Sequence, residues 1–218
     1  MTINRKICPP GLKNNPNRNL TAINFITIHC TGNYNATAGA LNHANYLFNG
    51  SNGAQVSWHY TVDGKEIWQS FEDRQACWHA GDGTNGAGNS TSIGVEICVN
   101  NRDAFRQACI NTAWLVAELL NRHKLGIDKV VQHNRWSGKN CPNELRSSAW
   151  GVTWNDFIGM VREALAPPEI TTVNDIVWQL AHRGILSDRE LWLKKLEEDQ
   201  NAYWLARKTV AFLRGKGV

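Results

Sequence analysis

Three residues whose side chains suit metal binding stand out by their type and their place in the sequence. His29 ends an apolar segment that indicates a buried strand, and His133 directly follows a second, short β-branched run. Cys141 comes eight residues after His133. Two imidazoles and one thiolate suit zinc, and three protein ligands leave a fourth position for water, as catalytic zinc requires. The spacing alone leaves a second interpretation open, in which two buried histidines and a loop cysteine are unrelated.

Other chemical motifs are excluded by their context or are absent from the sequence. Residues 81–86 spell Gly-Asp-Gly-Thr-Asn-Gly, the spacing of a dinucleotide-binding loop, but they lead into a strand at Ser92 where such a loop needs a helix. No Gly-x-Ser-x-Gly, His-Glu-x-x-His or Walker motif occurs. The six cysteines form no Cys-x-x-Cys pair, and without an export signal they are expected to be reduced thiols.

Alternating strands and helices must position these residues. The predicted strands cover residues 24–30, 57–62, 65–71, 92–99 and 130–131. The Asp63-Gly64 pair is typical of a tight turn and makes the second and third strands a hairpin. The predicted helices cover residues 37–48, 103–123 and 153–165, and the Gly- and Asn-rich segment 81–90 is expected to be a loop. This alternation indicates an α/β fold.

The pattern changes after two prolines at residues 167–168, which break the chain. No strand pattern follows them. Three helices are predicted instead, at residues 173–183, 188–198 and 201–214. The sequence therefore predicts two domains, a catalytic one at residues 1–166 and a small, all-helical one at residues 170–218.

The amino-acid composition argues against some classes of protein function. The chain has 218 residues, of which 42% are hydrophobic and 19% charged, so it can form a sizeable core. No apolar run is long enough to cross a membrane, and a dispersed net charge of +4 gives no argument for nucleic-acid binding. The first ten residues contain no apolar signal stretch, which predicts synthesis in the cytoplasm without a signal peptide. Ten tryptophans are many for this length, and a groove for sugars or peptides is one use for them.

Several segments, in order along the chain, together resemble a known enzyme family. They are Phe25-Ile-Thr-Ile-His29-Cys-Thr-Gly32, Ser57-Trp-His-Tyr60 with Asp63-Gly64, Trp78-His-Ala-Gly81, Ser92-Ile-Gly-Val-Glu96-Ile, and His133 with Lys139 and Cys141. They look like the zinc-dependent N-acetylmuramoyl-L-alanine amidases of the phage lysozyme type, a group that includes the animal peptidoglycan recognition proteins. The resemblance covers about residues 20–145 and is nearest to phage and prophage endolysins and autolysins of Gram-positive bacteria. It implies a mixed central β-sheet flanked by helices.

The resemblance assigns the central chemistry to five residues. His29, His133 and Cys141 take the positions of the Zn2+ ligands. Glu96 takes the position of a catalytic glutamate, and Lys139 that of a catalytic lysine. Zinc would acidify a water and polarise the carbonyl of the amide that joins N-acetylmuramic acid to L-alanine. Glu96 would move a proton from this water to the leaving amine, and Lys139 would stabilise the oxyanion.

The residues that contact the substrate are less sharply defined by the resemblance. Some phage members carry a catalytic tyrosine where Trp58 stands, and Tyr60 lies two residues further, on the same strand face. This departure puts a tyrosine role in doubt. Substrate contacts are expected from Trp58, His59, Tyr60, Trp78 and His79. The remaining histidines, His43, His123 and His182, are interpreted as surface or capping residues.

The implied partner is bacterial peptidoglycan, which the protein would reach after holin-type release or lysis. Two other functions stay open: a non-catalytic peptidoglycan-binding protein and a cytoplasmic amidase that recycles soluble muropeptides. Non-catalytic family members typically lack the cysteine ligand, so Cys141 favours the enzyme. A helical domain at residues 170–218 argues against a recycling enzyme, because a cytosolic hydrolase needs no wall anchor. That domain could bind the wall, pair two copies of the chain or complete the catalytic core.

Overall fold

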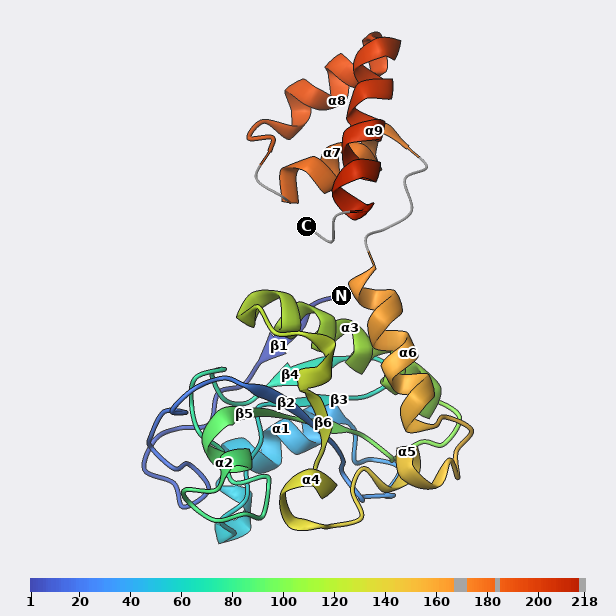
Figure 1. Ribbon diagram of the computed structural model, residues 1–218. Helices are drawn as coiled ribbons and strands as arrows, with labels where there is room; N and C mark the ends of the chain where they lie inside the picture. The colour runs from blue at the N-terminus through green and yellow to red at the C-terminus, as the bar shows by residue number, and fades with distance from the viewer. Residues whose placement is uncertain (167–171, 183–184, 216–218) are drawn as a thin grey trace. The chain divides into compact units, whose positions relative to one another are not determined.

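A computed structural model of the protein describes residues 1–166, 172–182 and 185–215. The chain divides into two compact units, Met1–Leu165 and Ala166–Val218, shown in Figure 1. Each unit has a hydrophobic cluster of its own. The two prolines at residues 167–168 and the predicted helix end at residue 183 lie outside the described residues.

The first unit is built on a six-stranded mixed sheet. Its strands, in spatial order, are β1 (Ile3–Arg5), β4 (Ile67–Gln69), β3 (Tyr60–Val62), β5 (Ser92–Ile97), β2 (Phe25–Cys30) and β6 (Val130–Gln132). The hairpin partners β3 and β4 are antiparallel, and every other neighbouring pair is parallel. The α/β fold with a mixed sheet, predicted from the sequence and its resemblance, is confirmed.

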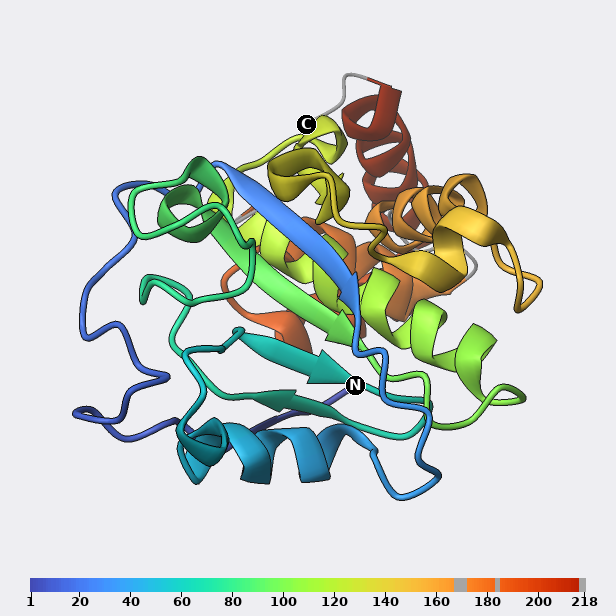
Figure 2. The ribbon, with the colours of Figure 1, turned by 90° about the horizontal axis from the view of Figure 1, so that it is seen from below.

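Helices cover both faces of this sheet. Helix α1 (Ala40–Phe48) contacts β3 and β4 on one face, and α3 (Phe105–His123) covers the opposite face, as Figure 2 shows. Helix α6 (Trp154–Leu165) packs along α3. The larger hydrophobic cluster lies between the sheet and these two helices. A smaller cluster, which includes Leu47 of α1 and Trp58, fills the other side.

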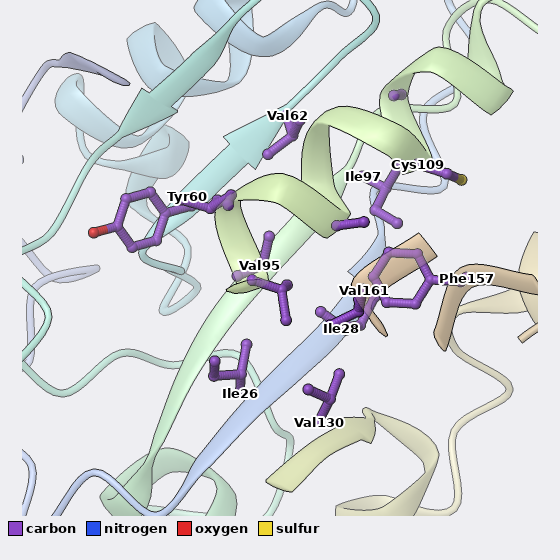
Figure 3. Close-up of a cluster of buried hydrophobic side chains, with 14 of the residues drawn as sticks. Ile26, Ile28, Tyr60, Val62, Val95, Ile97, Cys109, Val130, Phe157 and Val161 are labelled. Carbon is purple, nitrogen blue, oxygen red and sulfur yellow. The ribbon is translucent and has the colours of Figure 1, made fainter. Parts of the chain in front are cut away.

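Side chains along β2 and β5 alternate between the hydrophobic core on one face of the sheet and the opposite face, which carries α1. Successive side chains of a strand point to opposite faces of the sheet. Ile26 and Ile28 of β2, and Val95 of β5, point toward α3 and belong to the larger cluster (Figure 3). The residues between and after them, among them His29 and Glu96, therefore point to the face that carries α1. These two residues lie directly opposite each other in the parallel register of β2 and β5.

Several short elements were not predicted. Strand β1 adds a parallel edge beside β4, and two short helices, α4 (Asn134–Ser137) and α5 (Asn143–Ser147), flank Cys141. The prediction of a loop at residues 81–90 is wrong in its last part, because α2 (Ala87–Thr91) begins there. The Asp82 carboxylate accepts hydrogen bonds from two backbone N–H groups of α2 and so stabilises a turn that residue pattern alone does not show.

The second unit contains α7 (Val173–His182), α8 (Arg189–Glu198) and α9 (Gln200–Gly215), close to the three predicted helices. One apolar cluster holds them together, with Ile176, Val177, Leu180, Leu196 and Val210 buried in it. Among the described residues, no helix combines the length and the apolar character that a membrane crossing needs.

Candidate active site

The predicted metal-binding residues meet at one edge of the sheet. His29 is the next-to-last residue of β2, and His133 directly follows β6. Because β2, β5 and β6 run parallel, their carboxyl ends share an edge, which is where α/β sheets commonly place ligands. The segment that carries Cys141 is tied to this edge because the backbone carbonyl of Cys141 accepts a 3.0 Å hydrogen bond from the N–H of Asn134. Three distant parts of the chain thus converge.

The side chains of His29, His133 and Cys141 form one buried group. Their donor atoms all lie within 4.8 Å of one another. The Nδ1 atoms of the two histidines are 2.9 Å apart, and the Sγ of Cys141 is 3.9 Å from the Nδ1 of His29. No member is more than 5% exposed. Such a cluster of nitrogen and sulfur donors is able to hold a metal ion.

Burial sets the protonation of these side chains. It lowers the pKa of His29 well below the usual histidine range, and the neighbouring His79 and His133 lower this pKa further. Burial also lowers the pKa of His133. It raises the pKa of the Cys141 thiol to about 12, an effect to which the Glu96 carboxylate adds. In the protein alone, both imidazoles are therefore neutral and the thiol is protonated near neutral pH.

The Nε2 atoms of His29 and His133, called the outer ring nitrogens here, are both hydrogen-bonded. The Nδ1 atoms therefore remain able to bind a cation. The Nε2 of His133 is 3.0 Å from the carbonyl oxygen of Ala80, which can only accept, so this nitrogen carries the ring proton. The Nε2 of His29 is engaged by the Nδ1 of His79 at 3.0 Å. Two buried Nδ1 atoms that face each other at 2.9 Å, beside a sulfur, fit a metal ion that prefers nitrogen and sulfur ligands.

Two further charged residues share this space. An oxygen of the Glu96 carboxylate lies 3.9 Å from the Nδ1 of His29. Burial raises the pKa of Glu96 to about 8, and the positive charge of Lys139 opposes this rise. The second carboxylate oxygen, Oε2, is buried and has no hydrogen-bond partner among the described residues. With this pKa, Glu96 is largely protonated near neutral pH in the protein alone. A nearby cation favours its ionised form, whose open oxygen beside the three donors is placed to take a proton from a water.

A cavity of about 400 Å³ is lined by the three donor residues together with Glu96 and Lys139. Of the residues predicted to contact substrate, Trp58 and His79 line it. The rest of its wall includes residues that the sequence analysis did not single out for the site, namely Cys30, Thr31, Asn33, Ala38, Asn42, His43, Tyr46 and Val56. Four of these come from α1 or the turn before it. The helix thus forms a side wall of the cavity rather than only covering the sheet.

The structure does not place the other three predicted contacts in this cavity. The ring of His59 is fully buried between the Gln75 carbonyl and the N–H of Gly94. Tyr60 points into the core, where its hydroxyl donates to Asp73. The ring of Trp78 lies under the Arg18 guanidinium instead.

The position of Tyr60 has a local cause. Strand alternation predicted Tyr60 on the same face as Trp58, but β3 begins only at Tyr60, after a bend at His59. Alternation therefore does not extend back to Trp58, which packs beside α1 in the smaller cluster. Trp58 and Tyr60 consequently lie on opposite sides of the sheet.

The prediction for His43 is wrong. This residue was expected at the surface or at a helix cap, but it is only 8% exposed and lines the cavity. Its Nδ1 lies 3.0 Å from the Gly39 carbonyl, one turn earlier in the chain. One face of α1 carries a polar and aromatic stripe made of Asn42, His43 and Tyr46, at spacings of one, three and four residues. This stripe could have identified the cavity wall that α1 forms.

Comparison with known proteins adds independent information. Residues 19–144 match the family described as N-acetylmuramoyl-L-alanine amidase. N-acetylmuramoyl-L-alanine amidase CwlH of Bacillus subtilis strain 168 is 37% identical over 172 residues, which cover 79% of this chain and 66% of that protein. N-acetylmuramoyl-L-alanine amidase XlyA of the same strain is 42% identical over 68% of this chain and 47% of that protein. The chain thus matches from about half to just under two thirds of the length of these relatives.

Two solved structures agree with this result. The catalytic domain of XlyA is 40% identical, with a TM-score of 0.66, and the match covers 74% of this chain and 99% of that one. A mutant endolysin from Bacillus subtilis is also 40% identical, with a TM-score of 0.67 and the same shares of the two chains. The matched family region contains all five residues at the centre of the cavity, His29, Glu96, His133, Lys139 and Cys141.

Proposed function

The chain belongs to the N-acetylmuramoyl-L-alanine amidase family, and from this premise we propose that it hydrolyses the amide bond between N-acetylmuramic acid and the L-alanine of the peptidoglycan stem peptide. The observation that carries this proposal is the cavity in which the His29, His133 and Cys141 donors lie beside Glu96 and Lys139. The likeness to an endolysin supports a role as a phage or prophage endolysin. Such an enzyme reaches the cell wall after holin-type release or lysis.

In this proposal, His29, His133 and Cys141 hold a zinc ion. When bound, zinc supplies an acidified water and polarises the amide carbonyl. Glu96 accepts the proton of the attacking water at its open Oε2 and returns it to the leaving nitrogen. Lys139 lines the same cavity and stabilises the negative charge that develops on the carbonyl oxygen.

The aromatic wall of the cavity suits the carbohydrate and the stem peptide. The rings of Tyr46 and Trp58 stack with their centroids 6.4 Å apart and an interplanar angle of 25°. The indole of Trp58 is fixed by its N–H, which donates to the Thr61 hydroxyl at 2.6 Å. A rigid, mostly apolar face with a few polar groups is typical of small-molecule sites. We assign this wall to a sugar face or to the methyl groups of the stem peptide.

The expected result is release of free L-alanyl amino groups from purified cell walls, together with about one zinc per chain. Amino-group labelling and metal analysis measure the two quantities. A chain that sediments with walls but releases no amino groups would be a binding protein. A chain that cleaves soluble muropeptides and leaves intact sacculi unchanged would be a recycling amidase. Either outcome contradicts the proposed function.

The second unit is proposed to target the enzyme to the wall. It has its own apolar cluster, yet Leu191, Trp204 and Leu205 remain 47–69% exposed on α8 and α9. The Arg207 guanidinium lies 5.8 Å from the centre of the Trp204 ring. Large apolar side chains kept in solvent favour contact with a partner surface. The wall is the partner we propose, and a second copy of the chain is the alternative.

A chain that ends at Leu165 is expected to keep its zinc and its activity on small soluble muropeptides. Its binding to whole walls should weaken by about tenfold or more, because a linked second binding module raises avidity. Co-sedimentation with walls and turbidity assays measure the loss. Equal lysis by the truncated and full chains would contradict targeting. A drop in molecular mass from dimer to monomer with unchanged wall binding would assign residues 170–218 to dimerisation, and an insoluble product would show that they complete the core.

A further inference from the structure

Two adjacent residues contact the outer ring nitrogens of both metal-binding histidines. The Nδ1 of His79 lies 3.0 Å from the Nε2 of His29. The backbone carbonyl of Ala80 lies 3.0 Å from the Nε2 of His133. A single dipeptide therefore contacts two ligands that are far apart in the sequence, and the Ser137 hydroxyl, 3.1 Å from the Nε2 of His133, adds a second contact to that ligand. No role in the site has been assigned to Ala80, and His79 was expected only to touch the substrate.

The hydrogen-bond chain behind His79 has a fixed direction. The Nε2 of His79 lies 3.3 Å from the Ser92 carbonyl and 3.4 Å from the Ser92 hydroxyl. The carbonyl can only accept, and the hydroxyl donates its one proton to the Gly88 carbonyl at 2.7 Å. The proton of the neutral His79 ring must therefore be on Nε2, so its Nδ1 accepts from the Nε2–H of His29. This bond leaves the lone pair of His29 on Nδ1, the atom that faces His133.

Asn89 holds the dipeptide in place. Its side-chain oxygen accepts hydrogen bonds from the backbone N–H groups of both His79 and Ala80, at 2.9 and 2.8 Å. Its amide nitrogen donates to the Gly83 carbonyl at 3.1 Å. Asn89 is only 2% exposed, so its hydrogen bonds are largely shielded from bulk solvent. The side-chain oxygen of Asn89 thus sets the positions of both His79 and Ala80, the two residues that contact the metal-site histidines.

Close packing confines the dipeptide from the other side. A Cβ atom on Gly94 would lie 2.8–3.0 Å from the ring atoms of His79. A Cβ atom on Gly88 would lie 2.4 Å from the Cβ of Ala80. Both distances are shorter than real Cβ contacts, so the glycines let the dipeptide lie directly against β5 and α2. The supports of the histidines have little room to shift.

We propose that His79 and Asn89 are positioning residues of the metal site, which act together by holding the imidazoles of His29 and His133 with their Nδ1 atoms toward the metal. The inference rests on the zinc site of the proposed function. Residues that orient metal-ligating histidines typically change metal affinity by about 10- to 100-fold when they are replaced. A residue that only touched substrate would leave zinc binding unchanged.

Two matched pairs of variants test this inference in the full chain. His79→Asn keeps an acceptor oxygen where the Nδ1 of His79 lies, whereas His79→Gln keeps only a group near the Nε2 position. Asn89→Asp keeps the acceptor oxygen, whereas Asn89→Leu has a similar size and no acceptor. Asn111→Leu is the control, because Asn111 is also buried and hydrogen-bonded but lies on α3, outside the cavity.

The measurement is the rate at which a chromophoric chelator removes zinc, with circular dichroism and thermal unfolding as the check of folding. We expect His79→Gln and Asn89→Leu to lose zinc about 10- to 100-fold faster than the parent chain. His79→Asn and Asn111→Leu should stay within a few-fold of it, and Asn89→Asp, which keeps the acceptor oxygen but loses the donor to the Gly83 carbonyl, should fall between Asn89→Leu and the parent chain. If Asn89→Leu does not fold, the rates of zinc loss from His79→Gln and His79→Asn test the positioning role by themselves.

Three other outcomes have separate meanings. Equal zinc retention in all variants and the parent would overturn the positioning role while leaving the zinc site intact. Equal loss in His79→Asn and His79→Gln would overturn the role assigned to the His79 Nδ1. A parent chain that binds no zinc would overturn the metal assignment of the proposed function itself, and the inference with it.

Discussion

Replacing Cys141 with alanine is expected to remove zinc and amidase activity together. Cys141 supplies the only sulfur of the three donors within 4.8 Å of one another, and a three-ligand site that loses its thiolate retains two neutral imidazoles. Metal activation contributes several kcal/mol to hydrolysis, and about 4 kcal/mol corresponds to about 10³-fold in rate. Activity on purified walls should fall by about that factor or more. Metal analysis of the purified variant measures the loss of zinc.

The matched control is Cys109→Ala, because Cys109 is a fully buried free cysteine in the core on α3. This variant removes a buried thiol without touching the cavity, so it should lower stability and keep the zinc. A Cys141→Ala protein that still binds a full equivalent of zinc would show that the third ligand has been assigned to the wrong residue.

Replacing Glu96 with glutamine should separate the chemistry from metal binding. Glutamine has nearly the same shape but cannot take up the proton of the attacking water. We expect zinc content and thermal unfolding close to those of the parent chain and turnover lowered by about 10²-fold or more, the usual scale for a lost general base. Initial rates of amino-group release, measured at saturating substrate, give the comparison.

Glu144→Gln provides the control for this variant. Glu144 is a second buried carboxylate, which accepts a 2.6 Å hydrogen bond from the Tyr34 hydroxyl and does not line the cavity. It acts on Glu96 only through its charge, which adds to the raised pKa of Glu96. The same substitution there should change turnover by no more than a few-fold. Turnover of Glu96→Gln that stays close to the parent value would make Glu96 a structural residue and would require another base.

The convergence of His29 and His133 could be predicted because it depends on strand direction. His29 and His133 each come at the carboxyl end of a short apolar run, and parallel strands bring such ends together without detailed knowledge of side-chain packing. Cys141 is different. It is held by the short helices on either side of it, which carry no strong periodic pattern, so its place followed from the family resemblance.

The walls of the cavity were harder to predict because they depend on local backbone bends and on distant partners. The bend at His59 breaks the alternation that would have put Tyr60 beside Trp58. His43 is buried because α1 packs against β3 and β4. The polar and aromatic stripe on α1 marks the face that forms the wall, but it does not show that this helix lies against the sheet. The position of His79 depends on Asn89, which belongs to a short helix predicted as loop.

The alternation along β2 has a consequence for how this protein can change over time. Ile26 and Ile28 face the main core, whereas His29 faces the cavity from the same short strand. Selection for a folded protein and selection for a working catalyst therefore act on different, interleaved positions. Chemistry can be altered at one set without loosening the other, which lets such a scaffold acquire new specificities in small steps. Inserting or deleting one residue in β2 would turn the core-facing side chains toward the cavity and the cavity-facing side chains toward the core. The fold and the site would then be lost together.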